Sequence, residues 1–312
     1  MLGYIVRRLL ASVPVLLGTT FLIFVAVYAL PGDPITALAG EDQTISPAVR
    51  RELTERYGLD DPLLVQYVNY LTGLFVGDFG VDFRGVEVSY VIARAWPTTV
   101  LLALTAWVLM AVFGIGLGAI AGLRPGGVVD GAVLAATTVL IGIPFFVVAY
   151  VGQIVFGLEF GWFPTSGTRD GWPLSYVLPA ASLAIFGVPE LARLTRASIL
   201  ENRYADYVHA AVAKGLSPMR IAVRHVLRTS LIPVVSMLGL SLGGLLGGAV
   251  LVEGIFNVPG LGYAIFTAIG QQNGPVVVGI GSLVVLVFLG VNLLVDLMYG
   301  VLDPRVSLDR RG

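Results

Sequence analysis

Few side chains in this sequence could do chemistry, and their types exclude most catalytic sites. The 312-residue chain has no cysteine and two histidines. His209 and His225 are sixteen positions apart, a spacing that matches no compact zinc motif. The single lysine, Lys214, precedes Gly215 and Leu216, so it does not complete a phosphate-binding Gly-Lys-Ser/Thr loop. We therefore predict no catalytic residue and no metal site, and any use of ATP requires another polypeptide.

One carboxylate stands out from the apolar sequence around it. Glu253 follows a long apolar stretch and opens the phrase EGIFNVPGLG, with no basic residue nearby in sequence. An ionisable group at the end of a membrane span is a functional candidate by default. The alternative is a structural carboxylate that accepts backbone N–H bonds from the Gly-rich turn that follows. The sequence leaves both interpretations open.

The composition is that of a membrane protein. Hydrophobic residues make up 56% of the chain and charged residues 12%, and the mean hydropathy is +0.88. Soluble domains usually contain about 25% charged residues. A net charge of −1 does not favour a nucleic-acid partner. A span needs about 20 apolar residues, and six windows approach or exceed this length: Leu9 to Leu30, Pro97 to Leu123, Val133 to Leu158, Ser175 to Val188, Leu231 to Val252, and Val276 to Val301. The fourth window is short, and we expect it to run on toward Ala192.

The distribution of basic residues predicts the orientation of these spans. Six crossings place thirteen of the nineteen Lys and Arg residues on one side of the membrane and six on the other. The positive-inside rule assigns the richer side, with both termini, to the cytoplasm. The first span is longer than a signal-peptide core of about 7–15 residues, so we expect it to remain as an anchor.

A long polar segment, residues 31–96, separates the first two spans. Ser46-Pro47 is a helix start and Gly58 a helix stop. The residues between them share one apolar stripe: Val49, Leu53 and Tyr57. This segment is predicted to be a small extracytoplasmic cap.

Glycines fall four residues apart in two of the spans. Gly114, Gly118 and Gly122 lie in the second span, and the fifth span carries a similar series. Small residues at this spacing let helix backbones approach closely. Packing within one subunit explains them, and movement against a partner subunit is the functional alternative.

A polar segment interrupts the spans near residues 204–230. Asp206 to Lys214 has helical spacing, and Gly215 is a plausible residue in left-handed conformation after it. Ser217 and Pro218 supply an N-cap and a first-turn proline for a second helix. Seven of the nineteen basic residues fall between Arg193 and Arg228. The segment is predicted to be a cytoplasmic pair of helices with a docking surface.

These residues resemble a known family. Ala210-Ala211, separated by three residues from Gly215, is similar to the coupling motif of ABC importer permeases, although His209 stands where that motif usually has glutamate. The stretch from Ala213 to Leu216 and the pair Arg224-His225 resemble the dipeptide/oligopeptide branch, the "B" type permeases of peptide and nickel systems. Further phrases resemble the same branch: Gly32-Asp33-Pro34, Tyr57 to Asp60, Gly77 to Gly80, Pro97 to Thr99, Glu253 to Gly262, and Asp303-Pro304-Arg305.

The resemblance implies an all-α polytopic membrane protein with six transmembrane helices, the type I ABC importer transmembrane domain, plus the cap. The implied parts are residues 1–30 (tail and first helix), 31–96 (cap), 97–301 (five-helix core, with coupling helices at 204–230) and 302–312 (cytoplasmic tail). It also implies a prokaryotic cytoplasmic membrane, alternating access, and no cofactor in this chain. The implied partners are a second homologous permease subunit forming a heterodimer, two ATPase subunits that bind ATP and Mg, an extracytoplasmic peptide-binding protein and membrane lipid.

The resemblance also selects candidate site residues. The expected ATPase-coupling residues are Asp206, His209, Ala210, Ala211, Lys214, Gly215 and Leu216. The expected gate or translocation-path residues are Glu253, Phe256, Asn257 and Pro259. The cargo is expected to be a di- or oligopeptide, with nickel complexes and glutathione as alternatives. An ion-coupled secondary transporter and an intramembrane enzyme are the competing classes, and neither requires the Ala-Ala-Gly helix pair.

Overall fold

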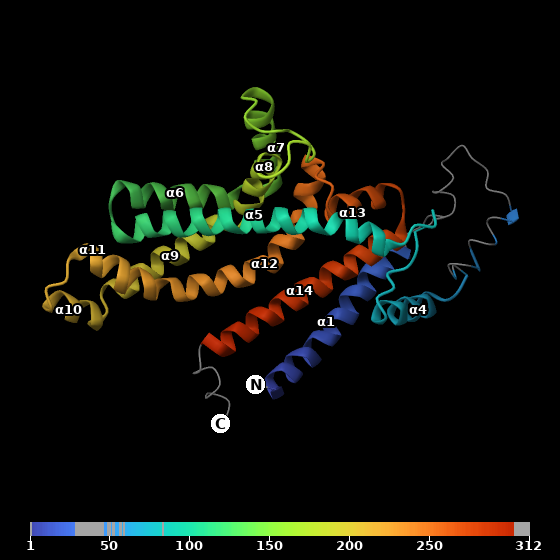
Figure 1. Cartoon of the computed structure of the whole chain (residues 1–312), viewed down its shortest axis with the longest axis horizontal. Coiled ribbons are helices and arrows are strands. Elements are labelled where there is room, and N and C mark those ends of the chain that lie inside the picture. Colours follow the sequence, from blue (N-terminus) through green and yellow to red (C-terminus); the bar gives the residue numbers. More distant parts are fainter. Residues whose placement is uncertain are drawn as a thin grey trace.

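Apolar helical segments separated by short turns give a chain made of helices (Figure 1). The computed structural model describes residues 2–28, 47, 48, 51, 54, 55, 58, 60–82 and 84–302, with side chains in these ranges except at 2–5 and 296–302. The main elements are α1 (Leu2–Tyr28), α4 (Leu63–Phe75), α5 (Val88–Leu123), α6 (Val128–Gly142), α7 (Phe145–Gly152), the π-helical η1 (Gln153–Glu159), α8 (Leu174–Ala184), α9 (Val188–Arg203), α10 (Asp206–Ala213), α11 (Pro218–Ile221), the π-helical η2 (Ala222–Leu227), α12 (Arg228–Phe256), α13 (Leu261–Gly270) and α14 (Gly274–Leu302).

The described helices confirm the predicted fold class. Four stretches are long and apolar enough to cross a membrane: Val6–Tyr28, Val88–Leu123, Pro218–Phe256 and Gly274–Val295. Two bent helix pairs bring the number to six if each pair is one span. The expected helix from Ser46 to Gly58 falls largely outside the described residues, as does the tail 303–312.

The third predicted span is broken rather than straight. Ile143 is extended, with φ −101° and ψ 124°, and Pro144 follows it. The residue before a proline is driven out of the helical region by the proline ring, and the proline has no N–H to donate. Helix α6 and the α7–η1 arm therefore meet at 100°, and Figure 1 shows α7 standing out from the bundle.

The fourth predicted span is also bent and is much longer than its apolar window. Helices α8 and α9 meet at 62°, and α9 continues to Arg203 rather than stopping near Ala192. A Cβ on Gly187, at the bend, would overlap Met110 of α5. The absence of a side chain at this position lets the bend lie against α5.

Two helices begin earlier than their apolar windows predict. Helix α5 begins at Val88, so its first turns are already helix where the sequence predicts the cap. The helix of the fifth span begins at Pro218, because α11, η2 and α12 form one continuous helix. Hydropathy marks the lipid-crossing part of a helix, whereas backbone hydrogen bonding carries the helix beyond that part.

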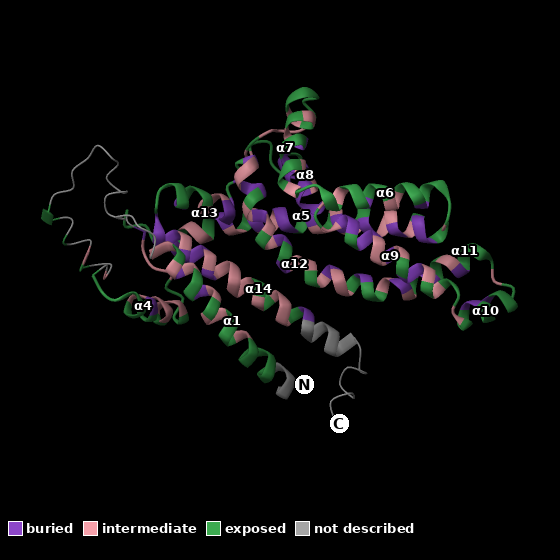
Figure 2. Ribbon diagram, turned by 180° about the vertical axis from the view of Figure 1, so that it is seen from behind, coloured by how far each residue is buried: buried purple, intermediate pink, exposed green. Residues whose placement is uncertain are grey.

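Close packing of α5 against α9 forms the centre of the bundle. An added Cβ on Gly114 would lie 2.7 Å from Leu191, and one on Gly122 would lie 2.9 Å from Ile199. Gly118 faces the backbone of Ala192. These three glycines therefore pack within the subunit, as the first interpretation predicts. Figure 2 shows buried residues along α5 and α12, whereas α1 is mostly exposed, with 11% of its apolar window buried.

The two ends of the bundle differ in structure. Helices α10 and α11 lie at one end, which we call the α10–α11 end, and α4 lies at the other, the α4 end (Figure 1). At the α4 end the Tyr67 hydroxyl donates to the Leu17 carbonyl at 2.8 Å, which fixes α4 to α1.

Candidate functional site: a two-helix projection and the contacts behind it

The projection from Tyr204 to Leu227 has the helix–turn–helix that its sequence predicts, although Ser217 occupies the N-cap position without a side-chain capping bond. Helix α10 ends at Ala213, Lys214 is its C-cap, and Gly215 has φ +73°. Pro218 is the first residue of α11, and the Ile221 N–H donates to the Ser217 carbonyl at 3.0 Å. A left-handed glycine followed by a proline start gives a sharp turn between two short helices.

One face of α10 packs inward and is not available to a partner. Val208 is 8% exposed and Ala211 is 5% exposed. Both belong to a small apolar cluster with Ile199 of α9, Ile221 and Val226, and Leu216 packs against it. Of the two alanines of the motif, only Ala210 lies on the exposed side of α10.

The outward face of the projection carries apolar and charged residues together. Large exposed apolar side chains gather here: Tyr204, Tyr207, Val212, Met219 and Val223. Met219 is 73% exposed and Tyr204 is 68% exposed. The exposed charged and polar neighbours are Asp206, His209, Lys214, Arg220 and Arg224. An exposed apolar patch rimmed by polar residues is typical of a protein–protein interaction site.

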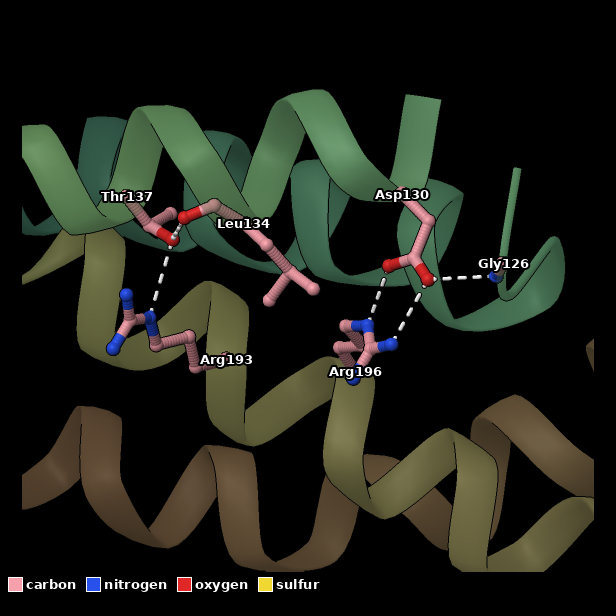
Figure 3. Close-up of polar contacts among 6 residues, drawn as sticks. All are labelled: Gly126, Asp130, Leu134, Thr137, Arg193 and Arg196. Atoms are coloured by element: carbon pink, nitrogen blue, oxygen red, sulfur yellow. Dashed lines mark hydrogen bonds and ion pairs between the residues drawn. The ribbon is translucent and has the colours of Figure 1, made fainter. Parts of the chain in front are cut away.

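Behind the projection, two arginines of α9 bind α6 (Figure 3). Arg196 donates through Nε to Asp130 Oδ1 at 2.5 Å and through Nη2 to Asp130 Oδ2 at 2.9 Å. The Gly126 N–H donates to the same Oδ2 at 2.8 Å. Asp130 also lies in the first turn of α6, where the helix dipole favours a negative charge. We call the Asp130–Arg196 pair and its Gly126 bond the α6–α9 clasp.

The second arginine, one turn away along α9, donates to two uncharged threonine hydroxyls. Arg193 donates to Thr137 Oγ1 at 3.1 Å and to Thr138 Oγ1 at 2.6 Å. Arg193 and Arg196 belong to the run of seven basic residues from Arg193 to Arg228, but both are bonded to α6 and lie before the docking segment 204–230. The sequence signal for these contacts is a lone aspartate after the turn at Gly126, together with two arginines three residues apart in α9.

The clasp is expected to contribute to stability as a coupled pair. Asp130→Asn leaves Arg196, 23% exposed, without its anionic partner, and a half-buried charge without a partner destabilises. We expect Asp130→Asn and Arg196→Gln each to lower the thermal unfolding temperature in detergent, and the double variant to lower it by less than the sum. Arg203→Gln, on the exposed end of the same helix, is the control and should change little. Additive effects would show that the two groups do not interact.

The second candidate group, Glu253 to Pro259, lies where α12, α13 and α5 meet. Glu253 is fully buried, and its Oε2 accepts the N–H groups of Gly262 at 2.6 Å and Tyr263 at 3.3 Å. Thr99 Oγ1 of α5 accepts the Leu261 N–H at 2.8 Å. These two side chains take up the free N–H groups at the start of α13. Glu253 therefore has the geometry of the structural alternative.

The other three residues of this group lie in three different surroundings. Phe256 is 1% exposed in the main core. Asn257 ends α12 in a left-handed conformation, with φ +48°. Pro259 is exposed. The phrase from Glu253 to Gly262 is not a single loop: Glu253 to Phe256 complete α12, and a further helix that the sequence does not predict, α13, begins at Leu261.

Glu253 is expected to stabilise the α12–α13 junction. In Glu253→Ala the buried Gly262 N–H loses its acceptor, at a cost of about 1–3 kcal/mol, whereas Glu253→Gln keeps an acceptor oxygen in place. We expect a clear fall in thermal stability for the alanine variant and a small one for the glutamine variant. If the glutamine variant were fully stable but inactive, the gate interpretation would be favoured over the structural one.

The fold and these contacts define a class of protein: a multi-pass α-helical membrane protein with a short two-helix projection at one end. Comparison with known proteins identifies the family within this class. Residues 114–308 match the family described as binding-protein-dependent transport system inner membrane component, and residues 1–103 match the N-terminal model of such components. The chain belongs to this family of ABC importer permeases.

Curated relatives cover the whole chain. A dipeptide transport system permease protein of Bacillus subtilis (strain 168) is 36% identical over 100% of both chains. An oligopeptide transport system permease protein of the same organism is 36% identical over 98% of this chain and 100% of its own length. A glutathione transport system permease protein of Salmonella typhi is 35% identical over 98% of this chain and 99% of its own length.

A solved structure has the same fold. An inward-facing MetNI methionine ABC transporter structure aligns with a TM-score of 0.58 at 19% identity, covering 69% of this chain and 97% of that chain.

Proposed function

We propose that this chain is the permease subunit of an ABC importer that carries di- or oligopeptides across the cytoplasmic membrane by alternating access. It has no ATPase site of its own in this proposal, and two partner ATPase subunits bind ATP and Mg. A second homologous permease subunit completes the channel, and an extracytoplasmic binding protein delivers the cargo.

The observation that carries the proposal is the outward face of the projection. Its exposed apolar residues and basic rim, held on two short helices, fit a groove on a soluble ATPase. The residues facing the partner are Asp206, His209, Ala210 and Lys214, and Gly215 sets the turn. Ala211 and Leu216 act from within by holding α10 on the bundle.

The projection has two rigid connections to the bundle. Helices α11, η2 and α12 are continuous, so movement at Pro218 is transmitted along α12 toward Glu253. Helix α9 leads directly into α10, and the α6–α9 clasp ties it to α6. Movement of the ATPases would therefore reach two sides of the bundle at once.

The proposed docking of the projection to cytoplasmic ATPases also sets the orientation of the chain in the membrane. With the projection in the cytoplasm, the α4 end faces outward and both termini face the cytoplasm, in agreement with the excess of basic residues on that side. The exposed apolar surfaces of α1 and the α7–η1 arm, including Tyr150 and Leu158, then contact lipid or the second permease subunit.

The identity of the cargo is the most detailed part of the proposal. Two of the relatives are named for dipeptide and oligopeptide transport, and another for glutathione, itself a small peptide. A peptide cargo is common to these names. Nickel complexes are the alternative within the same machinery.

Purification of the tagged chain from its native membrane in mild detergent tests the proposal. We expect two ATPases and a second permease to co-purify, and ATP hydrolysis to rise when the binding protein is added with a peptide. A stable chain that supports ion-gradient-driven uptake with no ATPase bound would overturn it in favour of the ion-coupled class.

A further inference from the structure

The α4 end contains a hollow that the coupling residues do not explain. It has a volume of about 460 Å³ and lies between the start of α5, the helix α13 and the loop before α5. Pockets of about 300–1,000 Å³ are typical of small-molecule sites. Arg84 and Arg94 both line it.

The loop before α5 is shaped so that it presents Arg84. Asp82 is 6% exposed, and its Oδ1 accepts the N–H groups of Arg84 and Val86, each at 2.8 Å. The Arg84 guanidinium donates through Nη2 to Gln271 Oε1 at the end of α13, at 3.2 Å. The loop and α13 therefore hold this guanidinium at the rim of the hollow.

The second guanidinium comes from α5. Arg94 is exposed, and its Cζ lies 5.9 Å from the centre of the Tyr90 ring. Tyr90, Tyr263 and Thr267 line the same hollow and carry hydroxyls that can donate hydrogen bonds. Among the residues that the structure describes, neither Arg84 nor Arg94 forms an ion pair with a carboxylate.

The charge balance of the hollow favours an anion. The charged residues lining it are Asp82, Arg84 and Arg94. Asp82 offsets one of the two positive charges, and its Oδ1 already accepts two backbone N–H groups. One positive charge remains, together with guanidinium donors, whose planar fork matches a carboxylate.

We propose that this hollow binds the C-terminal carboxylate of a short peptide on its way into the transporter. The proposal rests on the proposed function, which places the α4 end outside and makes a peptide the cargo. Two guanidiniums and several hydroxyls recognise the carboxylate, and the apolar walls from Val91, Ala95 and Ala264 accept side chains of varied size.

Direct binding to the purified importer complex tests this, in lipid nanodiscs and without the binding protein. The probes are dialanine and dialanine amide, and saturation-transfer NMR measures the binding of each. We expect the amide to bind about tenfold more weakly or worse, because a hydrogen bond to a charged group is lost. The double variant that carries both Arg84→Gln and Arg94→Gln should bind dialanine as weakly as the wild-type complex binds dialanine amide. The Arg84→Lys and Arg94→Lys pair should recover part of the affinity, and Arg169→Gln, an exposed arginine outside the hollow, should change nothing.

Three results would overturn the assignment. These are no dialanine binding to the wild-type complex, equal binding of acid and amide, or unchanged dialanine binding in the double glutamine variant. If that variant instead weakened only the docking of the loaded binding protein, the hollow would be a docking contact for an acidic side chain. Stimulation of ATP hydrolysis by the binding protein, measured on the same sample, reports on the proposed function separately. An importer that is stimulated but binds no dialanine loses only the carboxylate site.

Discussion

Gly215→Val is expected to reduce transport by the proposed importer by about tenfold while the protein still reaches the membrane. Gly215 has φ +73°, and nothing lies within 4 Å of an added Cβ. The substitution therefore acts through the backbone alone. A left-handed conformation costs a residue with a side chain about 1–2 kcal/mol, and a β-branched residue resists it most. If valine reorients α10 relative to α11, that strain corresponds to about tenfold weaker engagement of the ATPase.

The measurement is uptake and ATP hydrolysis in proteoliposomes, with protein abundance measured in parallel. Gly161→Val is the matched control, because Gly161 also has positive φ, +63°, and open space around it, but follows η1 and is not part of the projection. Gly215→Asn should stay near wild type, since asparagine tolerates the left-handed region. If Gly215→Val lost protein from the membrane, or if Gly161→Val lost transport equally, the turn would be structural and not a coupling element.

Gly262→Ala is expected to destabilise the protein far more than the same change at Gly270, the other glycine of α13. A Cβ at Gly262 would overlap the Cα and carbonyl carbon of Val250, which are backbone atoms of α12. Backbone atoms cannot move aside as a side chain does, so the cost should lie at the upper end of the about 1–3 kcal/mol that overpacking causes. The displacement would also pull the Gly262 N–H away from Glu253, adding the loss of a buried hydrogen bond.

The experiment compares Gly262→Ala with Gly270→Ala in the same helix. Gly270 ends α13, and an added Cβ there meets nothing within 4 Å, so alanine should be neutral or slightly stabilising. We expect Gly262→Ala to fall sharply in folded yield and in thermal unfolding temperature, and Gly270→Ala to keep both. Equal stability of the two variants would mean that α12 and α13 are not packed as closely as this geometry requires.

Several features of the protein could be predicted from the sequence because they depend on neighbouring residues. Long apolar windows predicted the spans, since about 20 apolar residues are needed to cross a bilayer whatever the tertiary structure. The turn at Gly215 and the start at Pro218 were predicted for the same reason, because φ preferences and the missing proline N–H act locally. Pro144 breaks the helix for local reasons, but the 100° bend it permits also depends on what α7 packs against.

The contacts that organise the candidate sites were not predictable in this way. Asp130 and Arg196 are 66 positions apart, Thr99 and Leu261 are 162 apart, and Arg84 and Gln271 are 187 apart. No local pattern couples such pairs, because their meeting depends on how whole helices cross. The same applies to Ala211, which a motif groups with Ala210 but which the packing of α10 on Ile199 buries.

The amino-acid sequence alone is enough to predict a polytopic helical membrane protein and the turn that separates α10 from α11. Hydrophobic burial in lipid and local backbone preferences are enough for those conclusions. Three features become visible only in the folded chain: Glu253 accepts N–H groups at the start of α13, Arg196 is bound to α6, and two arginines line one hollow at the α4 end. Each of these required the free energy of packing between distant helices, which brings together side chains that the sequence keeps far apart.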